Sequence, residues 1–324
     1  MRSVCDNNGV MLPLRPLLIL LLLSACAAPD DIRDSRFIMG TLVEFTISGA
    51  DQEQAFRAIS AAANEMQRIE DEFTIYGDRD NSVKRFNATP VGKQASLPDE
   101  VSDLLKVALQ IQKESRGAFN PALGKLNKLW GFSQAETPVS PPTEHQIEAA
   151  IPPALCFQQQ RKQWIRLDER CQLDFGAIAK GYAIDQGINI LRSHNIHNAV
   201  INAGGDIRLI GSHGERPWRI GIRHPRNKGD VIKALELEGD VAVVTSGDYE
   251  RFYIYQDKRY HHILNPETGW PASSVQSSTV IAENAMLADA WSTARFVMGN
   301  QPVKGFNKKC LMIDYRGQMT TDTL

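Results

Sequence analysis

Residues 174–210 read DFGAIAKGYAIDQGINILRSHNIHNAVINAGGDIRLI, and they contain each kind of element from which the fold is inferred. The polar start, DFGAIAKG, leads into a helical pattern over residues 181–193. Two short apolar runs follow, residues 198–201 and 207–210, separated by Ala203-Gly204-Gly205-Asp206. Apolar runs around a glycine pair predict two strands, with the glycine segment acting either as a hairpin turn or as a binding loop.

Outside this segment, helical and strand patterns alternate irregularly. Helical spacing occurs over residues 51–73, 98–116 and 284–298. Strand patterns occur over residues 37–47, 219–223, 242–245 and 252–255. Five prolines within residues 137–153 indicate a surface excursion around a short helix. Irregular alternation favours an α+β fold, with mixed or antiparallel sheets and packed helices, over a doubly wound parallel sheet.

The composition is that of an ordinary globular protein. The chain has 324 residues, of which 43% are hydrophobic and 23% charged, which excludes a disordered or fibrous chain. Lysine and arginine total 36 against 38 aspartate and glutamate, a net charge of −2. A nucleic-acid binder usually has a basic excess, so we expect no nucleic-acid partner.

The amino-terminal region predicts export and lipidation. Residues 17–23 are an aliphatic run after Arg15, too short to span a bilayer and typical of a signal peptide. Leu23-Ser24-Ala25-Cys26 resembles a bacterial lipobox, whose cysteine is acylated. We predict a signal peptide over residues 1–25, an acylated Cys26, a tether over residues 26–32 and one domain over residues 33–324. A plain signal peptide with an incidental cysteine is the alternative, and Met11 is a second possible start.

Acyl chains would attach the protein to a membrane, so we expect it in the cell envelope, at the periplasmic face of the inner membrane. That compartment would be oxidising for Cys156, Cys171 and Cys310. Cys156 and Cys171 lie 15 residues apart around a strand-like segment. They form either a disulfide between neighbouring strands or two buried thiols.

The chain lacks the usual nucleotide-binding, serine-hydrolase and metalloprotease motifs, but three segments could bind a phosphorylated ligand. The first is Asp174 to Gly181, where glycines, a helix amino end and Lys180 suit a phosphate or pyrophosphate. A tight strand-to-helix turn with a solvent-facing lysine is the alternative. The second holds His261 and His262, which point to opposite faces along a strand, so at most one faces a given site. The alternative is a surface pair before a turn.

The third segment contains Asp289 and Thr293, one helical turn apart on the same face. A carboxylate and a hydroxyl are hard oxygen ligands suited to Mg²⁺. In the alternative interpretation, Thr293 bonds back to the carbonyl of residue 289 while Asp289 faces solvent.

Taken in order, these segments resemble the ApbE family of FAD:protein FMN transferases, from about residue 37 to about residue 299. Eight segments carry the resemblance: Met39-Gly40-Thr41, Asn120-Pro121-Ala122-Leu123-Gly124 with Leu129-Trp130-Gly131-Phe132, Leu173-Asp174 through Lys180-Gly181-Tyr182, Ala203-Gly204-Gly205-Asp206, Trp218-Arg219-Ile220-Gly221, Thr245-Ser246-Gly247-Asp248-Tyr249, Tyr260-His261-His262-Ile263, and Ala288-Asp289-Ala290 with Thr293. Asn265-Pro266 and Asn120-Pro121 depart from the family's Asp-Pro pairs, which affects binding detail more than the proposed metal ligands.

The resemblance implies an activity and its partners. The FMN half of FAD would be transferred to a threonine, or a serine, of an acceptor protein, with Mg²⁺ required and AMP released. Acceptors would be subunits of sodium-pumping NADH:quinone reductase or of Rnf-type complexes. The alternatives are an FAD pyrophosphatase that yields FMN and AMP, and a lipoprotein that binds FAD without turnover.

The resemblance also implies roles for individual residues. Mg²⁺ would be held by the carbonyl of Ala177, the carboxylate of Asp289 and the hydroxyl of Thr293. His262 aligns with the family's catalytic histidine, and either His262 or a nearby carboxylate would remove the acceptor proton. The implied FAD contacts are Met39, Tyr76, Ala122, Leu123, Gly124, Asp174, Lys180 and Ile263.

Overall fold

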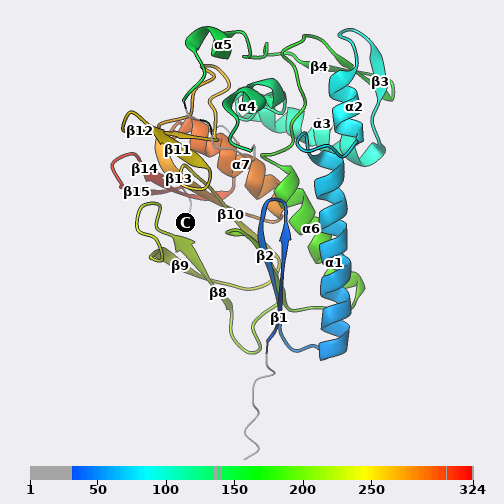
Figure 1. Cartoon of the computed structure of the whole chain (residues 1–324). Helices are drawn as coiled ribbons and strands as arrows, with labels where there is room; N and C mark the ends of the chain where they lie inside the picture. Colours follow the sequence, from blue (N-terminus) through cyan, green and yellow to red (C-terminus); the bar gives the residue numbers. More distant parts are fainter. Residues whose placement is uncertain (1–30, 134–137, 139, 304, 323–324) are drawn as a thin grey trace, which may run out of the picture.

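The computed structural model of the chain describes residues 31–133, 138, 140–303 and 305–322. The predicted signal peptide and Cys26 lie outside the described residues. Figure 1 shows a central sheet with long helices beside it and a separate two-stranded hairpin. Within the described residues, no helix combines the length and the apolar character needed to cross a bilayer.

The central sheet has eight strands, and every neighbouring pair is antiparallel, so the predicted α+β class is confirmed. In order across the sheet, the strands are β1 (Ile32–Ile38), β2 (Thr41–Ile47), β6 (Ala199–Ala203), β7 (Asp206–Ile210), β10 (Val241–Gly247), β13 (Val275–Ala282), β14 (Lys309–Asp314) and β15 (Met319–Asp322).

Helices α1 (Gln52–Phe73), α6 (Ala179–Ser193) and α7 (Ala285–Met298) pack on one face of this sheet. Helix α1 begins where the Asp51 side chain accepts a hydrogen bond from the Gln54 N–H at 3.1 Å, a standard amino-terminal cap. Its buried residues recur at helical spacing, and they join the sheet residues of the same face in the main hydrophobic core. The three helical spans predicted from periodicity here are therefore confirmed.

The opposite face, which we call the outer face, carries a hairpin of β8 (Trp218–Arg223) and β9 (Val231–Leu237). Residues of β8 alternate between buried and exposed, so Trp218 and Ile220 point inward. They pack on Leu209 and Val243 of the sheet, in a second hydrophobic cluster. The hairpin thus covers the middle of the outer face.

The predicted single strand over residues 37–47 is wrong, because the chain reverses within it. Strands β1 and β2 form a hairpin, with Ile38 paired to Thr41. Met39 and Gly40 make the turn, with φ of 57° and 67°. Two consecutive left-handed residues are what a tight hairpin of this type needs, and a methionine in the first position gives little sequence signal for it.

The remaining elements form a region beyond one end of the central sheet (Figure 1). They include a three-stranded sheet in the order β3-β5-β4 and the hairpin β11-β12. The elements are α2 (Ser82–Ala88), β3 (Gln94–Ser96), α3 (Asp99–Glu114), α4 (Gly124–Trp130), α5 (Glu144–Glu148), β4 (Phe157–Gln160), β5 (Gln163–Arg166), β11 (Phe252–Tyr255) and β12 (Lys258–His261).

A disulfide joins Cys156 and Cys171 across the base of the β4–β5 hairpin, with their Cα atoms 5.3 Å apart. Of the two possibilities left open by the sequence, the disulfide is therefore the one found. Cys310 is a buried free thiol on β14.

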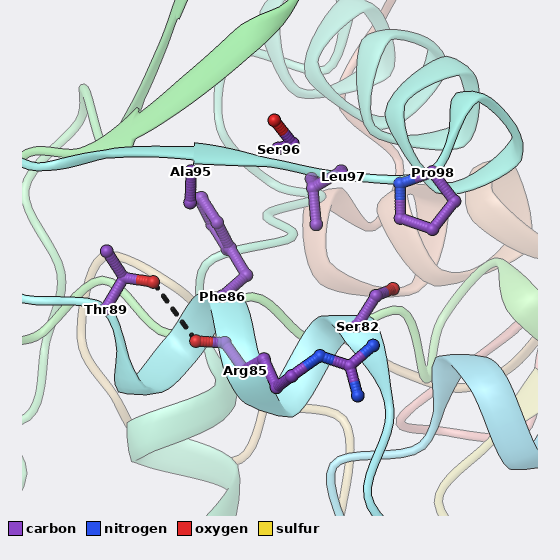
Figure 2. Close-up of a pocket in the computed structure, with 8 residues that line it drawn as sticks. All are labelled: Ser82, Arg85, Phe86, Thr89, Ala95, Ser96, Leu97 and Pro98. Carbon is purple, nitrogen blue, oxygen red and sulfur yellow. Dashed lines mark hydrogen bonds between the residues drawn. The ribbon is translucent and has the colours of Figure 1, made fainter.

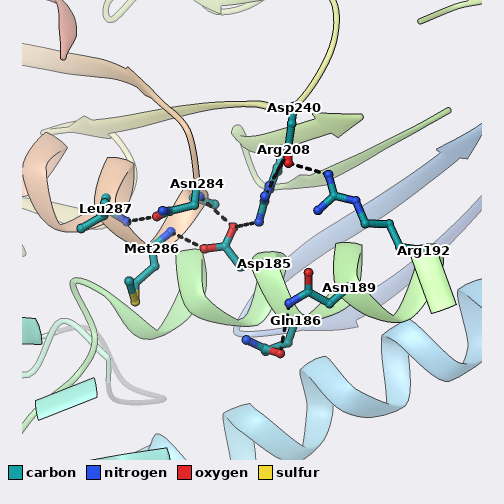
Figure 3. A network of polar contacts seen from close by, with 10 residues as sticks. Asp185, Gln186, Asn189, Arg192, Arg208, Asp240, Asn284, Met286 and Leu287 are labelled. Atoms are coloured by element: carbon teal, nitrogen blue, oxygen red, sulfur yellow. Dashed lines mark hydrogen bonds and ion pairs between the residues drawn. The ribbon is translucent and has the colours of Figure 1, made fainter. Parts of the chain in front are cut away.

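A buried ion-pair network fixes α6, α7 and β7 relative to one another (Figure 3). The Asp185 carboxylate accepts hydrogen bonds from Arg208 Nη1 at 2.6 Å and from the backbone N–H groups of Ala285 and Met286 at 2.8 and 2.9 Å. Arg208 also donates to Asp240. Because the first N–H groups of a helix have no partner within it, Asp185 stabilises the start of α7 from a neighbouring helix.

Candidate functional site

The first turn of α6 lies against the first turns of α7 at Gly181. The Gly181 N–H donates to Asp289 Oδ2 at 2.9 Å. A Cβ at this glycine would collide with the Ala285 carbonyl and lie 2.8 Å from the Asp289 Cβ, so only glycine allows this approach. The Gly181 N–H at the start of α6, which the sequence pattern suggests as a donor to an anionic ligand, is therefore already hydrogen-bonded to Asp289.

Asp289 is buried, so the interpretation that it faces solvent is wrong. Its backbone carbonyl accepts a hydrogen bond from Ser292 Oγ at 2.9 Å, the role that the alternative interpretation gave to Thr293. The Thr293 hydroxyl instead lies 3.1 Å from Ser246 Oγ at the end of β10. Ala177 lies in the turn before α6, four residues from Gly181. Asp289 and Thr293 thus lie where α6, α7 and β10 meet, and Ala177 precedes the start of α6 by two residues.

Lys180 and Asp206 form an ion pair beside this cluster, with Nζ and Oδ2 2.5 Å apart. Asp206 is buried at the start of β7, and its other oxygen accepts from the Thr245 N–H at 3.2 Å. Burial lowers the pKa of Lys180, but the Asp206 and Asp289 carboxylates outweigh this effect, so the pKa of Lys180 is raised overall. Lys180 is therefore held by Asp206, although its side chain remains 31% exposed to solvent.

The donor set fits a hard divalent cation. Burial, and then the nearby Asp206 charge, raise the pKa of Asp289 to about 7, against the opposing effect of Lys180. Excess negative potential at a buried carboxylate is what a bound cation relieves. No group of three or more His, Cys, Asp or Glu side chains arranged for a metal occurs in the described part of the chain. The predicted set is of another kind, with one carboxylate, one hydroxyl and one backbone carbonyl.

The predicted flavin contacts Ala122, Leu123 and Gly124 lie against the segment that ends at Asp174. The Gly124 N–H donates to the Gln172 carbonyl at 2.8 Å, and the Asp174 N–H donates to the Pro121 carbonyl at 2.9 Å. A Cβ at Gly124 would lie 2.8 Å from the Gln172 carbonyl oxygen, so this contact also needs glycine. Asn120 Oδ1 accepts from the Ala122 N–H at 2.9 Å, as an aspartate there could do.

Asp174 and Tyr76, two further predicted flavin contacts, lie close to each other. Asp174 accepts from Asn127 Nδ2 at 2.7 Å and from the Gly176 N–H at 2.8 Å. Burial, and then the Asp174 charge, raise the pKa of the Tyr76 phenol, whose oxygen hydrogen-bonds with the Ser133 side chain. Arg251 Nη1 donates to the same Ser133 hydroxyl at 3.1 Å.

Arg251 connects His262 to Tyr76, through the Ser133 hydroxyl. The Arg251 carbonyl accepts from the His262 backbone N–H at 3.1 Å and lies 3.3 Å from His262 Nδ1. Burial of the ring and the charge of Arg251 lower the pKa of His262 to about 3. His261 points the other way, into the core, where Nε2 lies 2.7 Å from the Ala272 carbonyl. The prediction that the two rings point to opposite faces, so that at most one can face a given site, is confirmed.

Met39 and Ile263 complete the set of predicted contacts. The Met39-Gly40 turn lies against the Arg251 guanidinium, which would be 3.2 Å from a Cβ at Gly40. Ile263 is buried, and its carbonyl accepts from the Ala272 N–H at 2.9 Å. Arg251 thus contacts or adjoins residues from three regions: the amino-terminal hairpin, the loop after α1 and the β11–β12 region.

The ApbE family model matches residues 39–313. This chain belongs to the ApbE family. It is 31% identical over 280 residues to the FAD:protein FMN transferase of Rhodobacter capsulatus, covering 85% of this chain and 53% of that one. It is 27% identical to the Escherichia coli K12 enzyme of the same name, covering 82% and 78%. The match thus spans about half the length of the first relative and over three quarters of the second.

Two solved ApbE structures share the fold. The ApbE protein of Thermotoga maritima superimposes with a TM-score of 0.82 at 33% identity, covering 91% of this chain and 97% of that one. The flavin transferase ApbE of Vibrio cholerae gives 0.78 at 26% identity, covering 90% and 96%. The expected ApbE-like fold is therefore confirmed over nearly the whole described chain.

A cavity of about 440 Å³ elsewhere in this ApbE protein does not coincide with these residues. It lies between α2 and residues 95–98, and the eight residues that line it include none of the predicted contacts (Figure 2). Its one charged lining residue, Arg85, is paired with Asp80. We therefore assign the site by contacts and charge rather than by cavity volume.

Three residues of the site have no assigned role in the sequence interpretation, namely Asp206, Ser246 and Arg251. Asp206 and Ser246 stand inside quoted segments, so their motifs gave a signal, but their partners Lys180 and Thr293 lie 26 and 47 residues away. Arg251 follows such a segment by two residues, and only the fold brings it to Tyr76 and His262.

Proposed function

We propose that this protein is an FAD:protein FMN transferase that requires Mg²⁺, joins FMN to a threonine or serine hydroxyl of an acceptor protein and releases AMP. Its curated relatives, which are similar to it over most of this chain, are named for flavin transfer. The observation that carries the finer proposal is the contact of Gly181 with Asp289, which sets Lys180 and Asp206 beside Asp289 and Thr293.

Asp289, Thr293 and the Ala177 carbonyl would hold Mg²⁺. When bound, the ion supplies positive charge to the FAD pyrophosphate and to the AMP leaving group. Hydroxyl and carbonyl ligands add no charge, so Asp289 is the one anionic ligand in the set. A bound cation would stabilise the ionised form of this buried aspartate, whose pKa is raised.

Lys180 provides the second positive charge. Asp206 holds its ammonium in place at 2.5 Å, so the group does not have to be ordered when FAD binds. A charged hydrogen bond contributes about 1.5–3 kcal/mol. Lys180→Ala should therefore weaken FAD binding or slow transfer by about ten- to a hundredfold.

His262 is suited to contact the acceptor hydroxyl as a neutral ring. A carbonyl only accepts, so the Nδ1 that faces the Arg251 carbonyl carries the proton, and Nε2 keeps a free lone pair. The low pKa keeps this form at neutral pH. Nε2 can accept a hydrogen bond from a threonine hydroxyl and orient it, and either this nitrogen or a nearby carboxylate takes the proton during attack.

Incubation of the purified protein with FAD, Mg²⁺ and an acceptor tests the proposal. The acceptor is the flavin-free form of a subunit that normally carries flavin in a sodium-pumping NADH:quinone reductase or an Rnf-type complex. We expect UV-fluorescent acceptor on a denaturing gel and free AMP, both lost with EDTA. Release of FMN and AMP without labelled acceptor would identify the FAD pyrophosphatase instead, and bound FAD without any product would identify a storage protein.

We further propose that Cys26 is acylated and anchors the protein at the periplasmic face of the inner membrane. The Cys156–Cys171 disulfide supports export, because such bonds persist in oxidising compartments. Cys26→Ser should stall processing or release the protein from membranes. Recovery of wild-type protein with an unmodified amino terminus away from membranes would contradict the anchor.

A further inference from the structure

The outer face of the central sheet is uncovered at its β1–β2 end. Phe37 and Leu42 are direct cross-strand partners there, so their side chains share a face. They are 75% and 51% exposed, although the neighbouring Val43 is fully buried against the helices. Exposed apolar side chains that adjoin one another, rather than standing singly, make this a candidate binding surface.

This pair lies near a small cavity beside strand β8, since the N–H of Gly204, a lining residue, donates to the Leu42 carbonyl at 3.1 Å. Leu42 and Glu44 alternate with buried residues on β2, and Glu44 is the cross-strand partner of Asn202. Asn202 Nδ2 donates to Glu44 Oε2 at 2.9 Å and also lines the cavity. The cavity has a volume of about 120 Å³, and its polar lining includes Arg223 and Glu250. Sites for whole cofactors measure about 300–1,000 Å³, so this one suits a single small side chain.

The turn of Gly204 and Gly205 connects this cavity to the Lys180–Asp206 ion pair of the proposed site. Both glycines line the cavity. The next residue, Asp206, pairs with Lys180 on the other side of the turn. Gly204 also packs on Thr41, whose hairpin turn lies against Arg251. A side chain in the cavity is therefore one backbone turn away from the Lys180 ammonium.

We propose that the outer face from Phe37 and Leu42 to this cavity is the docking surface for the acceptor protein. The occupant is a segment that places an apolar side chain on Phe37 and Leu42 and directs its threonine or serine past the Gly204–Gly205 turn. This rests on the proposed function, since transfer to a protein requires a second chain to reach the site. The Arg223–Glu250 pair, with a 3.1 Å hydrogen bond, gives the cavity both a donor and an acceptor for that segment's backbone.

A double variant, Phe37→Ser with Leu42→Ser, tests the surface, and both positions are exposed enough to leave the fold intact. Leu155→Ser is the matched control, because Leu155 is 66% exposed but lies beside the disulfide, outside this surface. With the flavin-free reductase subunit as probe, we expect the double variant to raise the KM for the acceptor about tenfold or more. Its FAD affinity and kcat should match those of wild type and of Leu155→Ser.

Photo-crosslinking tests the contact without turnover, so failure of docking and failure of transferase activity are separable. With p-benzoylphenylalanine in place of Phe37, we expect a crosslink to the same subunit, and none from the same replacement of Leu155. No crosslink from position 37, or an unchanged KM in the double variant, would overturn the proposal. Loss of binding to phosphatidylglycerol vesicles in the double variant, with the acceptor KM unchanged, would assign the surface to the membrane and equally overturn it.

Discussion

Gly181→Ala tests whether the contact between α6 and α7 holds the site together. Alanine is favoured over glycine in a helix by about 1 kcal/mol, so propensity alone predicts a more stable protein. The added methyl would instead collide with the Ala285 carbonyl oxygen, and a shift of about 1 Å between the helices would be needed to restore an ordinary contact.

The structure predicts that the collision outweighs propensity. Overpacking costs about 1–3 kcal/mol. A shift of this size also stretches the 2.9 Å hydrogen bond from the Gly181 N–H to Asp289, and a bond to a charged group contributes about 1.5–3 kcal/mol. After the gain in propensity, we expect a net loss of about 1.5–5 kcal/mol in the free energy of unfolding.

Gly187→Ala is the matched control in the same helix. A Cβ there would meet the end atoms of flexible side chains, 2.9 Å from Ile201 Cδ1 and 3.2 Å from Met66 Sδ. Both variants gain the same propensity, so urea denaturation of the two isolates the backbone collision. We expect Gly181→Ala to be the less stable and to need more Mg²⁺ for transfer. A Gly181→Ala protein as stable as Gly187→Ala, with unchanged Mg²⁺ dependence, would refute this reasoning.

Three further predictions concern the site and its support. Asp289→Ala should abolish flavin transfer by removing the one anionic ligand, whereas Thr293→Val should reduce it less because water can replace a neutral oxygen. Both effects are measured as flavin transfer against Mg²⁺ concentration, with circular dichroism as the folding control. Full activity of Asp289→Ala at low Mg²⁺ would contradict the assignment. Asp185→Ala should cost about 3–5 kcal/mol, because it leaves a buried arginine without one of its carboxylates, and a shift in urea midpoint below about 1 kcal/mol would show the network to be dispensable. Replacing Cys156 and Cys171 by serine should cost about 3 kcal/mol, the loop-entropy value for 15 residues, and equal stability of the variant and the oxidised wild type would argue against it.

Sequence periodicity predicted the helices and strands that bury one face and expose the other. It failed for elements that are buried on both faces and for turns that depend on local backbone geometry. Helix α1 has its apolar residues on one face and was predicted within a residue of its observed start. Strand β13 was missed, because Gln276 to Thr279 are polar yet buried in the sheet. A run of buried polar residues whose partners lie on other strands does not resemble a strand in the sequence alone.

The site divides in a similar way. Sequence motifs predict Lys180, Asp289 and His262 as site residues, because their neighbours in the sequence form characteristic segments. The ion pair of Lys180 with Asp206 and the contact of His262 with Arg251 could not be predicted, since each depends on how elements pack. The same holds for Gly181, whose need for glycine comes from the Ala285 carbonyl about a hundred residues later.

The strand order of the central sheet has a consequence for the order in which this protein can fold. Strands β1 and β2 pair through a two-residue turn, but β2 meets its other neighbour, β6, only after about 150 further residues. Relative to a loop of about ten residues, that closure is roughly four doublings longer and costs about 2.4 kcal/mol more in chain entropy. The hairpin that carries Met39 can therefore form early but joins the sheet late. When the chain is synthesised from its amino end, the Met39 hairpin can join the central sheet only after Ala199–Ala203 has been made.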